Sequence, residues 1–200
     1  MDLVSRAKAV VLKPKEEWLK IKEEPATAAQ LFQSYAVPLA AIPAVAQFIG
    51  YGLIGMRVPF YGMYRLGLGG SLVRAVLAYV FSLASVFLFA LIINVLAPNF
   101  KSKQDLPGAM KLAVYSMTPM WLAGILYIIP VLGILAVLAG LYGLYILYLG
   151  FATPLMDTPK ENVTTYYIVS LIVVIVLSVI FGLILGAIFV LRPGVSTIPY

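Results

Sequence analysis

The chain has 200 residues, of which 62% are hydrophobic, with a mean hydropathy of +1.02 and a formal net charge of +6. No water-facing surface can absorb so large an apolar fraction, so the composition excludes a soluble domain. Cysteine and histidine are both absent, which also excludes disulfides, Ser-His or thiol catalysis and the usual zinc, copper and haem sites. We therefore expect no enzyme activity, no metal and no cofactor.

Residues 1–33 form a charged N-terminal segment. Pro14 suits the first turn of a helix, and good helix formers follow it as far as Pro25. Trp18 and Ile21 form an apolar edge among the charges, and Trp prefers the headgroup level of a bilayer. The pattern predicts an amphipathic interfacial helix on the cytoplasmic membrane surface, with a solvated charged tail as the alternative.

Four stretches of the chain contain no Lys, Arg, Asp or Glu. They are residues 25–56, 75–100, 112–156 and 162–191. A hydrocarbon core about 30 Å thick needs about 20 apolar helical residues, so three stretches fit one membrane span each and the longest fits two, with a turn at Pro130 and Gly133. The predicted spans are residues 34–53, 71–97, 108–129, 131–153 and 163–191, within a transmembrane domain 34–192 that is followed by a short tail, 193–200.

The distribution of basic residues predicts the orientation. With the N-terminus in the cytoplasm, ten of the 14 Lys and Arg residues lie on the inner side and four on the outer side. Positive residues gather in cytoplasmic loops, so the N-terminus is predicted to be cytoplasmic and the C-terminus external. This bias explains the positive net charge without a nucleic-acid partner. The predicted fold class is an all-α integral membrane protein with five transmembrane helices.

Uncharged polar residues supply the candidate ligand site. At about 1.5 Å per residue, Asn94 and residues 115–118 fall at similar depth in the inner half of the bilayer, and tyrosines of the fourth span approach that level. One interpretation is a polar, aromatic pocket open to the cytoplasm. The other is hydrogen bonding between helices, which also satisfies the backbone freed by Pro119. The candidate residues are Asn94, Asn99, Tyr115, Ser116, Thr118, Tyr142 and Tyr145.

The fifth predicted span carries Ser178, Gly182 and Gly186 at a spacing of four. Such a ridge of small residues lets another helix approach closely, so it predicts packing within the bundle or a homo-oligomer. None of the predicted spans contains a carboxylate, which argues against a proton-driven pump or secondary transporter. A channel or a site built from backbone carbonyls stays compatible with the sequence.

Five short motifs occur in order at residues 12–24, 35–42, 94–100, 115–119 and 142–145. In this order they resemble the prokaryotic branch of the Yip family, the Ypt/Rab-interacting membrane proteins. The resemblance covers most of residues 10–190 and implies five membrane helices, with a cytoplasmic N-terminus, in a prokaryotic plasma membrane. Eukaryotic relatives are associated with Rab-type GTPases. A GTPase partner follows here only by analogy, because the N-terminal segment is short and the Asp-Leu-Tyr-Gly-Pro motif of those relatives is absent.

Two functions are compatible with these observations. The first is a non-enzymatic membrane-organising or interaction protein, which binds membrane lipid through its N-terminal segment and self-associates through helix faces. The alternative is a channel or transporter for an ion or small solute through the inner-half polar cluster. That alternative predicts a hydrated passage past Thr118 toward Gln47, the only amide deep in the first span.

Overall fold

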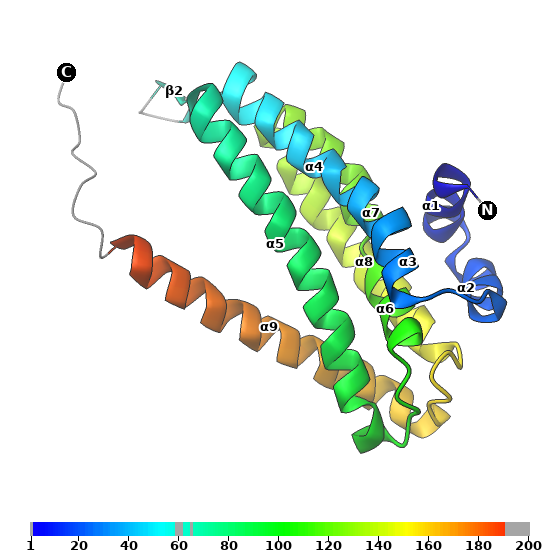
Figure 1. Ribbon diagram of the computed structural model, residues 1–200. Helices are drawn as coiled ribbons and strands as arrows, with labels where there is room; N and C mark the ends of the chain where they lie inside the picture. Colours follow the sequence, from blue (N-terminus) through cyan, green and yellow to red (C-terminus); the bar gives the residue numbers. More distant parts are fainter. Residues whose placement is uncertain (1, 59–61, 65, 191–200) are drawn as a thin grey trace.

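A computed structural model describes residues 2–58, 62–64 and 66–190 of the chain (Figure 1). Four helical segments in this part are long and apolar enough to cross a membrane. They are Ala28–Ile54, Gly67–Phe100, Leu106–Ile128 and Pro130–Ala152. Each coincides with one of the first four predicted spans, with boundaries that differ by a few residues. The predicted multi-pass helical architecture is therefore confirmed for these four segments.

The N-terminal segment folds into two short helices, α1 (Leu3–Leu12) and α2 (Pro14–Glu23). The Asp2 carboxylate caps α1 by accepting a hydrogen bond from the Ser5 amide, and Pro14 begins α2 as the sequence predicts. The two helices form a hairpin that packs beside the helical bundle instead of extending from it (Figure 1).

The first span is a composite of four helical pieces. They are α3 (Ala28–Leu31), the π-helical turn η1 (Phe32–Ala36), α4 (Val37–Ile49) and the π-helical turn η2 (Gly50–Ile54). Thr27 and Gln30 form a reciprocal capping box at its start. Pro38 has no N–H to continue the α-helical ladder, and the π turn directly before it absorbs that defect.

A short β-hairpin joins the first two spans. Its strands β1 (Met56–Val58) and β2 (Gly62–Tyr64) pair antiparallel, with Met56 opposite Tyr64. The all-α prediction missed this hairpin, because three-residue strands are too short to leave an alternating pattern. Helix α5 (Gly67–Leu96) follows and ends in the 3₁₀ turn η3 (Ala97–Phe100), where Pro98 stops the α-helix.

The third and fourth spans pack against each other. The third contains α6 (Leu106–Ser116), α7 (Thr118–Ala123) and η4 (Gly124–Ile128), and the fourth contains η5 (Pro130–Leu132) and α8 (Gly133–Ala152). The break between α6 and α7 follows from Pro119, which cannot donate to the Tyr115 carbonyl. The Thr118 hydroxyl makes that bond instead, at 2.8 Å.

The fifth predicted span lies in α9 (Lys160–Val190). Near its start, α9 contacts α5, α8 and η3, and Tyr166 is fully buried with its hydroxyl donating to the Ile93 carbonyl. Farther along, α9 diverges from the other helices (Figure 1). The side chains of Ser178, Gly182 and Gly186 lie outside the described residues, so the predicted small-residue ridge stays a prediction.

One end of the bundle is rich in lysine, and we call it the lysine-rich end. It contains the connections 101–105 and 153–159, the start of α9 and the α1–α2 hairpin. Apolar side chains are exposed along the outward faces of α5 and α8, as expected of helices that face lipid. Examples are Leu72, Val76, Val80, Ile134, Val137 and Leu141.

Candidate functional site

The residues predicted to form an inner pocket do not lie together. Tyr142 and Tyr145 are exposed on α8, and Asn99 is exposed in η3. Asn94 is half-buried on α5, and its Oδ1 atom has no hydrogen-bond partner among the described residues. These four residues therefore do not enclose a common cavity with the other three.

The remaining three predicted residues, Tyr115, Ser116 and Thr118, are buried where α6 meets α7. Besides its bond to the Tyr115 carbonyl, the Thr118 hydroxyl lies 3.0 Å from the Tyr35 hydroxyl of the first span. The Ser116 hydroxyl donates to the Ala113 carbonyl at 3.0 Å. Their polar atoms thus satisfy freed backbone and join two helices, which is the second of the two interpretations drawn from the sequence.

Trp18 is the main anchor of the α1–α2 hairpin. Its side chain is only 1% exposed, and its indole N–H donates to the Ile146 carbonyl of α8 at 2.9 Å. Gly150 makes room for the ring, because a Cβ atom there would lie 2.6 Å from the indole. Ile21 is also 1% exposed. The apolar edge that predicted a lipid-facing helix at Trp18 and Ile21 is therefore buried inside the protein.

A buried ion pair stabilises the hairpin internally. Arg6 of α1 lies 2.5 Å from the Glu17 carboxylate of α2, and both side chains are buried. Its second nitrogen donates to Glu24, and the guanidinium lies 6.0 Å from the centre of the Tyr115 ring. Burial by itself would lower the pKa of Arg6, but the hydrogen bond to Glu24 and the nearby carboxylates raise it above its ordinary value. Arg6 therefore stays charged inside the docked hairpin.

Two bundle residues bind the ends of the hairpin helices. The Lys111 ammonium donates to the carbonyls of Ile21 and Glu24, at 2.7 and 2.6 Å, and so places a cation at the negative end of α2. The Tyr142 hydroxyl donates to the Val11 carbonyl at the end of α1, at 2.8 Å. Both helices are thus attached to the bundle through their C-terminal carbonyls.

Sequence reasoning missed Arg6, Glu17 and Lys111. A signal existed for Lys111, because a cation inside an otherwise apolar predicted span is a marker of function or of a specific partner. No such signal existed for Arg6 and Glu17, because the N-terminal segment contains many charged residues and its composition is typical of a solvent-exposed segment.

One exposed surface of the hairpin, beside a groove between α1 and the first span, mixes apolar and basic side chains. Val4, Lys8 and Leu12 follow one another at a spacing of four along α1, and all three are exposed. Leu19 is exposed on α2. This stripe has the composition of an interfacial helix, because lysine can reach the headgroups while its neighbours stay in the acyl region.

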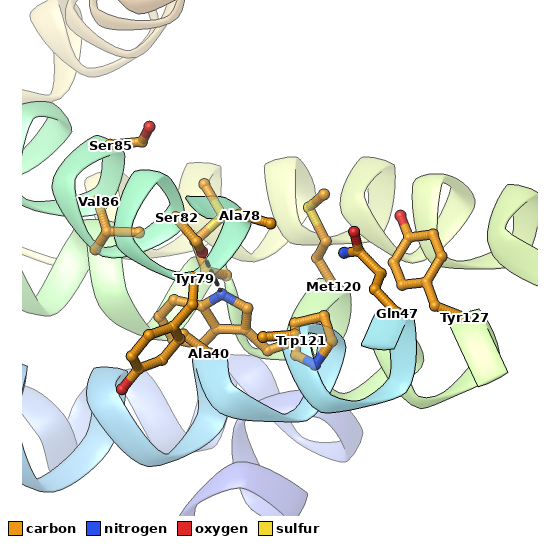
Figure 2. A pocket seen from close by; sticks show the side chains of 13 residues that line it. Ala40, Gln47, Ala78, Tyr79, Ser82, Ser85, Val86, Met120, Trp121 and Tyr127 are labelled. Atoms are coloured by element: carbon orange, nitrogen blue, oxygen red, sulfur yellow. Dashed lines mark hydrogen bonds between the residues drawn. The ribbon is translucent and has the colours of Figure 1, made fainter. Parts of the chain in front are cut away.

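A separate cavity of about 300 Å³ lies between α4, α5, α7 and η4 (Figure 2). Its walls are mostly apolar, and none of the described lining residues is charged. Two of its polar groups have protein partners: the Trp121 indole N–H donates to Ser82 at 3.2 Å, and the Tyr79 hydroxyl donates to the Val37 carbonyl at 3.0 Å. The cavity is therefore framed by hydrogen bonds between its walls.

Close backbone contacts hold the helices around this cavity. A Cβ atom at Gly50 would collide with the Tyr127 carbonyl, and one at Gly124 would lie 2.5 Å from Pro43. The first and third spans therefore touch directly on the side of the cavity away from the lysine-rich end. Towards that end, Thr118 is fully buried and is not among the described residues that line the cavity.

Comparison with known proteins assigns the chain to a family. The Yip1 domain model matches residues 8–188. The inner membrane protein YohC of Escherichia coli K12 is 30% identical over 118 residues, which are 59% of this chain and 60% of that protein. YohC of Escherichia coli O6:H1 matches to the same extent. The chain thus spans about three fifths of the length of these relatives, and no solved structure matches it significantly.

Proposed function

Since this chain belongs to the Yip1 domain family, we propose that it is a multi-pass protein of a prokaryotic inner membrane with a non-enzymatic, membrane-organising role. It acts through contacts with lipid and with neighbouring membrane proteins. The observation that carries the proposal is the docked α1–α2 hairpin. Trp18 and Lys111 hold it against the bundle, while Val4, Lys8 and Leu12 stay exposed beside a groove between α1 and the first span.

The position of α1 supports a location of this exposed stripe beside the inner leaflet. Tyr142 lies ten residues before Ala152, the end of α8, which corresponds to about 15 Å along the helix. Its hydroxyl reaches Val11, so the end of α1 lies alongside the half of α8 that leads to the lysine-rich end, and this half belongs to the inner leaflet in the proposed orientation. A helix at this depth occupies volume among the acyl chains on one side of the membrane only.

The charge of the hairpin favours anionic lipid as the partner. Arg6 is engaged with Glu17 and Glu24, and Lys13 and Lys20 pair with Glu16 and Glu17 at 3.7 and 3.3 Å. The hairpin presents five exposed lysines on α1, α2 and the residue between them. They are Lys8, Lys13, Lys15, Lys20 and Lys22. Lysines near the cytoplasmic leaflet attract anionic headgroups. A rigidly docked hairpin therefore holds its lysines at a fixed height, which a mobile tail would not do.

The proposal includes α9 as the fifth span. Its 31 helical residues are more than sufficient to cross a bilayer, and the excess of lysine at the opposite end favours a cytoplasmic N-terminus and an external C-terminus. Self-association through Ser178, Gly182 and Gly186 belongs to the same proposal.

Lipid selectivity tests the proposal. The protein is reconstituted in phosphatidylcholine, and electron paramagnetic resonance compares the immobilised fraction of spin-labelled phosphatidylglycerol with that of spin-labelled phosphatidylcholine. We expect a preference for phosphatidylglycerol that falls about fivefold in Lys8→Gln, because one lysine near the surface contributes about 1 kcal/mol. Lys103→Gln, which removes an exposed lysine from a connecting loop, is the matched control. Equal immobilisation of the two lipids by the unaltered protein would contradict the proposal.

Transport is the less well supported alternative. A passage from the lysine-rich end to Gln47 would have to open at Thr118 and Tyr35, whose hydroxyls are hydrogen-bonded in a buried contact. Proteoliposome flux measurements separate the two functions. A solute flux that depends on the protein and changes in Thr118→Val would favour transport over the membrane-organising role.

A further inference from the structure

The cavity between α4, α5, α7 and η4 contains polar groups that the fold itself does not use. No hydrogen bond to the Gln47 amide or to the Tyr127 hydroxyl occurs among the described residues. Figure 2 shows both side chains at the same end of the cavity, next to Met120, whereas Ser85 and Val86 lie at the other end. A primary amide in lipid without a partner is costly, because no water competes for its donors and acceptor.

The position of Gln47 argues against the simplest explanation for its unpaired amide, which is that bulk water solvates it. Gln47 lies seven residues before Ile54, the end of the first span, which is about 10 Å along the helix. Its neighbours in the cavity are largely apolar, including Pro43, Ala44 and Met120. Its two N–H donors and one carbonyl therefore point into a space that an apolar molecule with a single polar group would fill.

The surroundings of the cavity indicate that such a molecule arrives from the lipid. The cavity shares Ala44 and Tyr79 with an apolar groove between α4 and α5, and the groove is bordered by the exposed side chains Val45, Leu72 and Val76. In the direction of the lysine-rich end, the Tyr35 and Thr118 hydroxyls form a buried contact. The connection to the bilayer is therefore lined by apolar groups throughout, which suits a hydrocarbon chain.

From these observations we propose that the cavity is a binding site for an uncharged, membrane-soluble amphiphile with a hydroxyl or carbonyl head group. The head group forms hydrogen bonds with Gln47, and with Tyr127 beside it. The apolar chain of the amphiphile lies along Trp121, Met117 and Met120. The flexible thioether side chains of the two methionines adapt to its shape. A charged head group is disfavoured because none of the described lining residues offers a counter-charge.

Photolabelling with three probes tests this site. The probes are a diazirine-bearing hexadecanol, the corresponding methyl ketone and the corresponding carboxylate, added to the full-length protein in liposomes. We expect the alcohol or the ketone to label peptides that contain Gln47 or residues 117–127. Labelling by the alcohol alone indicates that the hydroxyl donates to the Gln47 carbonyl. Labelling by the ketone indicates that the Gln47 N–H donates to the head group, a bond that the alcohol can accept as well.

Gln47→Leu and Gln33→Leu form a matched pair, since Gln33 is an exposed residue of the same composite helix. Gln47→Leu should weaken labelling about 2- to 10-fold, the range expected for one lost hydrogen bond to a neutral group, and Gln33→Leu should leave it unchanged. Gln47→Leu should also raise the thermal stability of the protein in the absence of probe, because it removes an unpaired amide. A glutamine with a purely structural role would not combine these two effects.

Ala44→Leu provides a second variant, because it fills the junction of cavity and groove without removing a polar group. It should abolish labelling by the alcohol and the ketone alike. The proposal is overturned if neither of these probes labels the site, if labelling is the same in Gln47→Leu as in the unaltered protein, or if the carboxylate labels equally well. An experimental density map with only water in the cavity would overturn it too.

Discussion

Docking of the α1–α2 hairpin depends on a single missing methyl group at Gly150. In the structure a Cβ atom at this position would lie 2.6 Å from both the Trp18 indole and the Leu112 side chain, which is closer than real contacts allow. Gly150→Ala should therefore push Trp18 out of its site. Gly140→Ala on the same helix is the matched control, because its Cβ would meet only Met120, at an ordinary distance of 3.5 Å.

The magnitude follows from the strain of the extra methyl group, which costs about 1–3 kcal/mol in a closely packed site. Replacing a helical glycine by alanine also stabilises the helix by up to about 1 kcal/mol, but α8 is helical whether the hairpin is docked or not, so this gain does not change the docking equilibrium. Gly150→Ala should thus weaken docking by about 1–3 kcal/mol, and the undocked population should rise about 5- to 150-fold. In Gly140→Ala the helix effect acts alone, so the undocked population should not rise.

The absence of native cysteine makes the assay direct. A single cysteine replaces Val10, which is 1% exposed and faces the bundle, and its rate of reaction with a maleimide reports how often the hairpin leaves the bundle. Leu19→Cys, on the exposed surface of α2, serves as the always-accessible reference. Equal labelling rates at Val10→Cys in the Gly150→Ala and Gly140→Ala backgrounds would refute the docked position of Trp18.

Two further predictions concern the ion pair and the topology. Arg6→Met leaves the Glu17 carboxylate buried without its partner. It should therefore destabilise the protein by about 3–5 kcal/mol and lower the thermal midpoint by about 10 °C in detergent. Arg6→Met combined with Glu17→Leu should recover most of this loss, because no unpaired charge stays buried. A double variant as unstable as the single one would contradict the role of the pair. Single cysteines at Ser5 and Ser196 should react with membrane-impermeant maleimide from opposite sides of the membrane. Labelling of both from one side would rule out five spans.

The spans could be predicted because their signal is local. Residues 112–156 show that two helices must fit one charge-free stretch, and Pro130 marks their boundary at the position where α8 and its preceding 3₁₀ turn begin. The same holds for the bond that Thr118 makes to the Tyr115 carbonyl, since Pro119, four residues after Tyr115, leaves that carbonyl free. In both cases the cause and its consequence lie within a few residues of each other.

A multi-pass helical membrane protein and the positions of four candidate membrane-spanning helices could therefore be predicted from the sequence, since length and charge-free apolar composition are enough for that. The surface that Trp18 covers could not be predicted, because an apolar side chain gains as much free energy from burial in a protein interior as from burial in lipid. Only its contacts with Gly150 and Ile146, more than 120 residues away, distinguish these two environments. The tertiary structure likewise selected Glu17 and Glu24 as the partners of Arg6 and brought Gln47 to a cavity formed by three separate spans. Those choices depend on distances between helices, which no local pattern encodes.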